Sequence, residues 1–179
     1  MECFFIMILC TGNPQDNTVA SAVQKKIPNV DFASRTSGYD LRFWDAGSED
    51  FFRDKIKNYT IFINSSFICN GGQMQLLEVT YDIWTKNQIN GHIINIGSSA
   101  EWLGINSPFG SYSVQKRALR DRGLQLNTSR IKVTHITVGG LNDGQPGHEN
   151  WLDLEHVADA IAWVIAHPMN IPLLGIQKL

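Results

Sequence analysis

The sequence predicts an α/β fold: a single doubly wound, mostly parallel sheet with helices on both faces, in one domain that spans residues 1–179. Two observations predict it. Short apolar runs alternate with longer amphipathic stretches along the chain, which is typical of strands that alternate with helices. The runs 61–63 and 93–96 are almost entirely apolar, as strands are when helices cover both faces of a parallel sheet.

The expected elements follow this alternation. Strands are predicted over residues 3–10, 30–34, 39–43, 60–64, 92–97, 132–137 and 173–176. Helices are predicted between them, over residues 14–26, 49–57, 71–87, 112–126 and 154–166.

Residues at the expected helix ends support these assignments. Asn13 is predicted to cap the first helix, with Pro14 at its first position and Asp16 in its first turn, where the helix dipole favours a carboxylate. Asp153 is expected to cap the last helix.

Composition excludes several classes of protein. The net charge is −2, charged residues make up 18% of the chain, and hydrophobic residues make up 43%. These values argue against a disordered chain and against a nucleic-acid binder that works through a basic field. No apolar run approaches the roughly 20 residues of a membrane span.

Three cysteines without a CxxC pair favour a reducing, cytoplasmic location. The expected partner is a small-molecule substrate, and no metal site is expected.

Tyr112 and Lys116 open a predicted helix four residues apart, so the phenol and the ammonium share one helix face. A free phenol has a pKa of about 10, too high for proton transfer near neutrality. An ammonium about 4 Å away favours the phenolate by roughly 4 kcal/mol, or about three pKa units. The spacing therefore predicts a tyrosine that acts as a general acid or base near neutral pH.

Two hydroxyl side chains, Ser98 and Ser99, follow the predicted strand 92–97. Ligands of open α/β sheets bind at the carboxyl ends of the strands, where a serine can hydrogen-bond a substrate oxygen. Trp102 and Trp151 fall in predicted loops near this edge, where each contacts either the core or a substrate.

These residues, in this order, resemble the short-chain dehydrogenase/reductase family. The match consists of Asn95-Ile96-Gly97-Ser98 at the end of a strand, a loop, and Tyr-x-x-x-Lys from Tyr112 to Lys116 on a helix. Val133 to Gly139 resembles the family's strand that ends in Pro-Gly, with the proline lost. Glu155 to Ala158 resembles its Glu-Asp-Val-Ala segment.

The resemblance implies a Rossmann-like fold and an NAD(P)-dependent oxidoreductase that reduces a carbonyl or oxidises an alcohol. It implies that Tyr112 exchanges a proton with the substrate oxygen and that Lys116 lowers the tyrosine pKa and binds the cofactor ribose. Ser98, with Ser99 as the second choice, would orient the reacting oxygen. Asn70 would support a water-mediated proton relay. The family also suggests a homodimer or homotetramer.

The resemblance also implies a set of cofactor-binding residues. They are Thr11, Gly12, Ser34, Arg35, Asp40, Asn64, Lys116 and Gly139. Ser34 and Arg35 stand where an acidic residue would bind the ribose diol of NAD. Because a guanidinium suits a 2′-phosphate instead, NADP is the expected cofactor and NAD the second choice.

The phosphate-binding loop departs from the family pattern. The family has Thr-Gly-x-x-x-Gly-x-Gly, whereas Asp16 and Thr18 replace the two later glycines here. Glycine lets the backbone approach a pyrophosphate closely, and a carboxylate at a helix N-terminus competes with phosphate for the same amides. The alternative interpretation is therefore a catalytically inactive dinucleotide-binding or regulatory protein that retains the fold.

Overall fold

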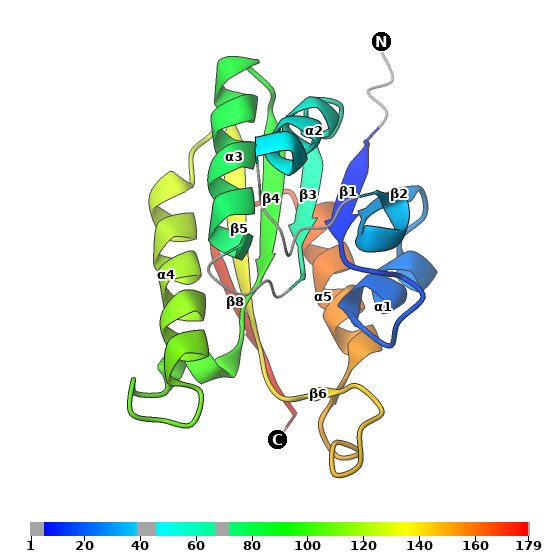
Figure 1. Ribbon diagram of the computed structural model, residues 1–179, viewed down its shortest axis with the longest axis vertical. Coiled ribbons are helices and arrows are strands. Elements are labelled where there is room, and N and C mark those ends of the chain that lie inside the picture. Colours follow the sequence, from blue (N-terminus) through cyan, green and yellow to red (C-terminus); the bar gives the residue numbers. More distant parts are fainter. Residues whose placement is uncertain (1–5, 39–45, 67–71, 179) are drawn as a thin grey trace.

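A computed structural model describes residues 6–38, 46–66 and 72–178 of the chain. Six strands form one sheet in the order β2-β1-β3-β4-β5-β8, and every neighbouring pair is parallel (Figure 1). The strands are β1 (Ile8–Thr11), β2 (Val30–Ala33), β3 (Ile61–Asn64), β4 (Gly91–Ile96), β5 (Ile131–Val138) and β8 (Leu173–Ile176). The predicted fold class is confirmed.

Helices cover both faces of this sheet. They are α1 (Val19–Lys26), α2 (Ala46–Ile56), α3 (Gly72–Lys86), α4 (Gly110–Leu126) and α5 (Leu154–Ala166). One core packs α1 and α5 against the sheet, and a second core packs α2, α3 and α4 against the other face. Two short pieces of 3-10 helix, η1 (Arg35–Ser37) and η3 (Ser99–Trp102), follow β2 and β4.

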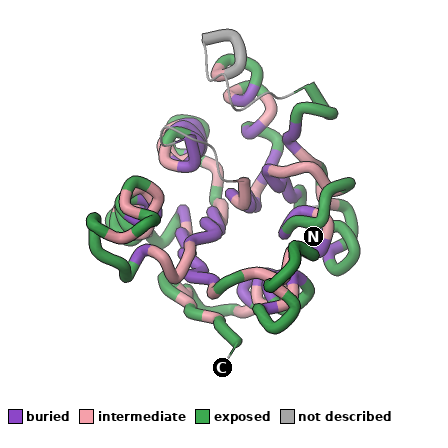
Figure 2. The backbone as a smooth tube through the Cα atoms, turned by 60° about the horizontal axis from the view of Figure 1, so that its bottom comes forward, coloured by how far each residue is buried: buried purple, intermediate pink, exposed green. Residues whose placement is uncertain are grey.

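The strand residues alternate between the two cores. Cys10 of β1 belongs to the core under α1 and α5, whereas its neighbour Leu9 belongs to the core under α2, α3 and α4. Ile63 and Phe62 of β3 divide in the same way. Both faces are thus apolar, which explains the continuous apolar runs in the sequence. Figure 2 shows buried residues gathered toward the middle of the molecule and exposed residues mainly around the outside.

The first helix begins later than predicted. It starts at Val19 with Thr18 as its N-cap, and its first turn holds no acidic residue. The backbone N–H of Thr18 donates to Ser21 Oγ, 3.3 Å away, which fixes the start of the helix. Asn13 instead accepts from the backbone N–H of Gln15 at 3.2 Å, so it forms a turn of its own. The expectation that Asp16 lies in the first helical turn was therefore wrong.

The other expected elements lie within a few residues of their predicted bounds. Asp153 occupies the N-cap of α5, but its carboxylate accepts from Asn142 Nδ2 rather than from the helix. The predicted strand 39–43 lies outside the described residues. Two short strands, β6 (Leu141–Asn142) and β7 (Leu152–Asp153), pair and close the loop 143–151 at its base. Within the part of the chain that the structure describes, no helix is long and apolar enough to cross a membrane.

Candidate active site

All six strands run in the same direction, so their carboxyl ends gather at one edge of the sheet, the lower edge in Figure 1. The chain passes from β1 to β2 on one side, whereas β3 pairs with β1 on the other side. The strand order reverses between β1 and β3, and open α/β sheets bind ligands at such a reversal. The predicted site residues that the structure describes therefore share one edge.

Ser98 and Tyr112 meet beyond the end of β4. Ser98 caps the short helix η3, where its Oγ accepts from the backbone N–H of Ala100 at 3.2 Å. The hydroxyl of Ser98 also lies close enough to the Tyr112 phenol to lower its pKa. Ser99 is the first residue of η3. The assignment of Ser98, rather than Ser99, to the substrate oxygen stays a prediction.

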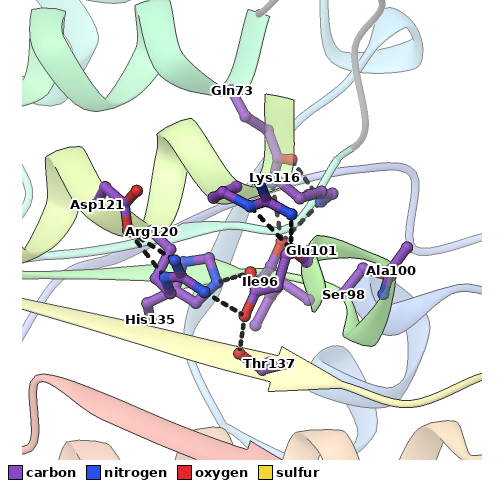
Figure 3. Close-up of polar contacts among 11 residues, drawn as sticks. Gln73, Ile96, Ser98, Ala100, Glu101, Lys116, Arg120, Asp121, His135 and Thr137 are labelled. Atoms are coloured by element: carbon purple, nitrogen blue, oxygen red, sulfur yellow. Dashed lines mark hydrogen bonds and ion pairs between the residues drawn. The ribbon is translucent and has the colours of Figure 1, made fainter. Parts of the chain in front are cut away.

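Lys116 lies one helical turn beyond Tyr112 on α4, with its Nζ 5.5 Å from the centre of the phenol ring. Its side chain is only 4% exposed. The ammonium donates to Gln73 Oε1 at 2.6 Å and to the backbone oxygen of Ile96 at 2.8 Å (Figure 3). The phenol, the serine hydroxyl and the ammonium therefore form one group where β4 meets α3 and α4.

The charge states in this group differ from the prediction. Burial raises the pKa of Tyr112, the hydrogen bond with Ser98 opposes the rise, and the negative charge of Glu101 adds to it. Burial also lowers the pKa of Lys116 to about 8, against the opposing effect of Glu101. The expected fall of the tyrosine pKa was thus wrong for this structure. The ammonium points to Gln73 Oε1 and to the backbone oxygen of Ile96, and it is not among the groups that lower the tyrosine pKa.

Gln73 was not found by sequence analysis. Near the start of α3, its Nε2 donates to the backbone oxygen of Asn64 at 2.8 Å while its Oε1 accepts from Lys116. Asn64 Nδ2 donates in turn to the backbone oxygen of Gln73 and to Asn95 Oδ1, at 2.9 and 3.0 Å. The predicted relay residue, Asn70, lies outside the described residues. Gln73 is therefore the α3 side chain that the structure places against the lysine.

Glu101 was also missed as part of the site. It is fully buried in η3, and its carboxylate accepts from His135 Nε2 at 2.9 Å and from Thr137 Oγ1 at 2.5 Å (Figure 3). His135 and Thr137 are two residues apart on β5, so they lie on the same face of the strand. The two-residue spacing on a predicted strand could have grouped His135 with Thr137. It does not indicate that their shared partner is Glu101.

No family model matches the sequence, and no curated protein matches it. Solved structures match in fold. A serine dehydrogenase from Escherichia coli has a TM-score of 0.68 at 18% identity, over 97% of this chain and 98% of that chain. A short-chain dehydrogenase from Streptomyces avermitilis has a TM-score of 0.70 at 15% identity, over 98% of this chain and 89% of that chain. The chain has the fold of the short-chain dehydrogenases. A third such structure, from Burkholderia cenocepacia and in complex with NADP, has a TM-score of 0.69 at 13% identity. The match covers 96% of this chain and 89% of that chain.

In this short-chain dehydrogenase fold, Thr11 and Gly12 end β1 at the reversal of strand order. Thr11 Oγ1 accepts from the backbone N–H groups of Ser65 and Ser66, at 2.9 and 3.0 Å, and so joins the ends of β1 and β3. Gly12 has a φ of +125°, and a Cβ there would lie 2.9 Å from Ala20 Cβ. Only glycine lets the chain turn this closely over α1.

In the loop that follows Gly12, several backbone N–H groups are hydrogen-bonded to acceptors of the loop itself and of the first turn of α1. The backbone N–H groups of Gln15, Asp16 and Thr18 donate to acceptors within residues 13–21. The sequence suggested that the Asp16 carboxylate occupies the first turn of α1. In the structure Asp16 is exposed and lies before the helix, so its carboxylate is not in that turn. An anion bound at this edge would lie next to Gly12 and the first turn of α1. No acidic side chain in that turn would repel it.

The remaining cofactor candidates lie along the same edge. Ser34 is buried and shares a hydrogen bond with Thr36 Oγ1 at 2.8 Å, beside the exposed Arg35. At the end of β5, the backbone N–H of Gly139 donates to the oxygen of Ile176 at 2.9 Å. Asp40 lies outside the described residues. Thr11, Gly12, Ser34, Arg35 and Gly139 thus all lie near the carboxyl ends of the strands.

Proposed function

We propose that this protein is an NADP(H)-dependent oxidoreductase that interconverts a carbonyl compound and an alcohol. The observation that supports this proposal most directly is the grouping of Ser98, Tyr112 and Lys116 at the carboxyl ends of the strands. Proton transfer at the substrate oxygen requires a titratable group within hydrogen-bond reach of it. The phenol of Tyr112 is half-buried beside a serine hydroxyl that can hold the same oxygen.

A bound nicotinamide dinucleotide supplies or accepts the hydride. The chain's own residues transfer the proton to and from the substrate oxygen. Tyr112 Oη donates a proton to the carbonyl oxygen during reduction and takes it back during oxidation. Ser98 Oγ orients that oxygen. Lys116 places a positive charge beside the phenol and stabilises the phenolate that reduction leaves behind. Gln73 and the oxygen of Ile96 fix the ammonium in this position.

We assign the cofactor to the edge that carries Gly12, the first turn of α1, and Ser34 with Arg35. The serine and the guanidinium after β2 favour NADP over NAD, because arginine binds a phosphate monoester well. The Burkholderia cenocepacia structure described above contains NADP, which is consistent with this choice. A cytoplasmic location and a homodimer or homotetramer remain predictions for this chain.

Calorimetric titration with NADP and with NAD tests cofactor binding, and absorbance of NADPH in the presence of a broad panel of aldehydes and ketones tests turnover. We expect binding of NADP, turnover by the wild type, and at least a ~100-fold lower kcat for Tyr112→Phe with unchanged NADP affinity. Binding without turnover would instead support the inactive dinucleotide-binding protein. The absence of any dinucleotide binding would overturn both interpretations.

A further inference from the structure

Apolar side chains are exposed between η3 and α4, the two elements that carry the hydroxyls of the site. Within the segment that joins them, the structure leaves four large apolar side chains open to solvent: Trp102 (61% exposed), Leu103, Ile105 and Phe109 (56% exposed). We refer to these four side chains as the apolar surface. The sequence left two roles open for Trp102, a core contact or a substrate contact, and its exposure excludes the core. Exposed apolar side chains that gather in one place mark a binding surface.

The apolar surface adjoins Ser98 and Tyr112. Trp102 is the last residue of η3, the short helix that Ser98 caps. Phe109 is the N-cap of α4, and its backbone oxygen accepts from the N–H of Ser113 at 2.7 Å, so it lies one helical turn before Tyr112 and Ser113. Residues three or four positions apart on a helix are neighbours on its surface. A substrate whose oxygen meets the two hydroxyls therefore has the apolar surface beside it.

The segment that carries the apolar surface is anchored at both ends. Arg117 of α4 donates from Nε and Nη2 to the backbone oxygen of Glu101, at 3.0 and 2.9 Å, and from Nη2 to that of Leu103 at 2.9 Å. Further along, a Cβ on Gly110 would overlap the backbone oxygen of Ile105, so the segment packs closely against the start of α4. The exposed apolar side chains thus stand on a fixed backbone.

The cations of this region are bound to the protein itself. The guanidinium of Arg117 binds the two backbone oxygens of the anchored segment. Arg120 binds Asp121 at 2.8 Å and lies 3.8 Å from the buried carboxylate of Glu101. Its guanidinium carbon also lies 4.5 Å from the centre of the Trp102 ring, a cation–π contact. The segment that carries the apolar surface contains no charged residue. A ligand carboxylate placed against it would therefore lose hydration without gaining an ion pair.

A second exposed aromatic side chain lies on the other loop of the same edge. Trp151 is 42% exposed, so it is not a core residue either. Its ring stacks on the His148 imidazole, with the ring centroids 3.7 Å apart and 15° between the planes. A Cβ on Gly140 would lie 2.8 Å from the indole, so the indole packs directly on the backbone. Figure 1 shows the loops 103–109 and 143–151 at the same, lower edge of the molecule. Both loops thus present aromatic rings at the carboxyl ends of the strands.

We infer that the substrate is an uncharged carbonyl compound or alcohol with a bulky aromatic or alkyl group, which packs on the apolar surface while its oxygen meets Ser98 and Tyr112. The inference rests on the proposed function, because it describes the part of the substrate that does not react. Small-molecule sites are lined mainly by apolar and aromatic side chains, with a few polar groups that fix orientation. Here the two hydroxyls fix orientation, Trp102 and Phe109 supply apolar contact, and Trp151 offers a further ring from the second loop.

Three aldehydes test this selectivity with NADPH as the reductant. We expect kcat/KM for 4-methylbenzaldehyde to exceed that for acetaldehyde at least ~10-fold, because only the former has a large apolar group to bury. It should exceed that for 4-carboxybenzaldehyde at least ~10-fold, because the latter has a similar shape but carries a negative charge. Equal kcat/KM for the three aldehydes would overturn the inference.

Variants of the apolar surface connect the selectivity to named side chains. Phe109→Ala and Trp102→Ala should each lower the ratio of kcat/KM for 4-methylbenzaldehyde to that for acetaldehyde at least ~5-fold, mainly through KM. Trp163→Ala is the matched control, since this tryptophan is also half-exposed but lies on α5, and it should leave the ratio unchanged. A general loss of stability would not change this ratio, so an unchanged ratio in both variants also contradicts the inference.

A binding measurement separates the inference from the proposed function. Saturation-transfer NMR detects contact between 4-methylbenzyl alcohol and the protein without cofactor, and we expect transfer to the ring protons that falls at least ~3-fold in Phe109→Ala and Trp102→Ala. This result without NADPH oxidation by any aldehyde would overturn the proposed function while still supporting an apolar ligand. Undiminished transfer in both variants would overturn the inference. If sedimentation shows that the variants instead dissociate an oligomer, with transfer unchanged, the apolar surface is a subunit interface and the inference is wrong.

Discussion

Lys116 Nζ lies 2.6 Å from the side-chain oxygen of Gln73, a residue 43 positions earlier in the chain. The contact joins α4 to α3 in the interior, where an ammonium without acceptors would be strongly destabilised. It also determines which way the ammonium points, and so which groups it stabilises. The lysine's role therefore depends on a residue that its local sequence does not reveal.

Replacement of this acceptor should destabilise the protein. Gln73→Leu removes the amide oxygen and leaves one donor of a buried ammonium without its partner, so we expect a loss of about 2–3 kcal/mol in the free energy of unfolding. Urea denaturation measures it. Gln125→Ala, on the exposed face of α4, is the matched control and should change stability by less than about 0.5 kcal/mol. Equal effects for the two variants would show that the Gln73 contact contributes nothing specific.

The pH dependence of stability should reveal Lys116. Burial lowers its pKa to about 8, so above that pH the folded chain has lost a proton that the unfolded chain still binds. The free energy of unfolding therefore rises with pH in this window. Relative to Lys116→Met, the wild type should gain about 2 kcal/mol between about pH 7 and about pH 9.5. Urea denaturation of both proteins at the two pH values measures the difference, and parallel pH profiles would contradict the burial of this ammonium.

Gly97 should tolerate no side chain. Gly97→Ala places a methyl group against the His135 imidazole, which forces β4 and β5 apart or displaces the imidazole from Glu101. We expect a loss of about 1–3 kcal/mol, measured by thermal or urea denaturation. Gly104→Ala provides the comparison, since no atom lies within 4 Å of its added Cβ. A stable Gly97→Ala protein with an unchanged His135 signal in NMR spectra would contradict the packing described here.

Arg35 should determine cofactor choice. Its guanidinium is exposed after β2, and a charge-assisted hydrogen bond to a phosphate contributes roughly 1.5–3 kcal/mol. Arg35→Ala should therefore weaken NADP binding at least ~10-fold and leave NAD binding unchanged, as calorimetry can measure. Arg130→Ala, at the opposite edge of the sheet before β5, should alter neither. Equal losses for both dinucleotides would assign Arg35 a role other than phosphate recognition.

Much of the fold was predictable because burial on both faces leaves a direct trace in the sequence. The apolar runs of β3 and β4 identified central strands, and the helices between them followed from spacing. The start of α1 was missed because Asn13-Pro14 is a strong local signal for a helix start, yet the tertiary structure keeps these residues in a loop over Gly12.

The site was predictable only where its residues are neighbours in the sequence. Tyr112 and Lys116 share a helix face, and Ser98 follows a recognisable strand. Gln73 and Glu101 reach the site through contacts between distant segments, and no local pattern encodes such contacts. The predicted fall of the tyrosine pKa failed for the same reason: it counted the ammonium but not burial or the carboxylate of Glu101.

Arg117 has a consequence for how the protein would respond to a ligand. Its guanidinium binds the backbone oxygens of Glu101 and Leu103 at once, so η3 and α4 form a single rigid unit. The hydroxyls of Ser98 and Tyr112 belong to that unit, so under the proposed function they are held in place before a substrate binds. Little conformational entropy remains to be lost at these two groups on binding, so adaptation to substrate shape falls to the loops 103–109 and 143–151.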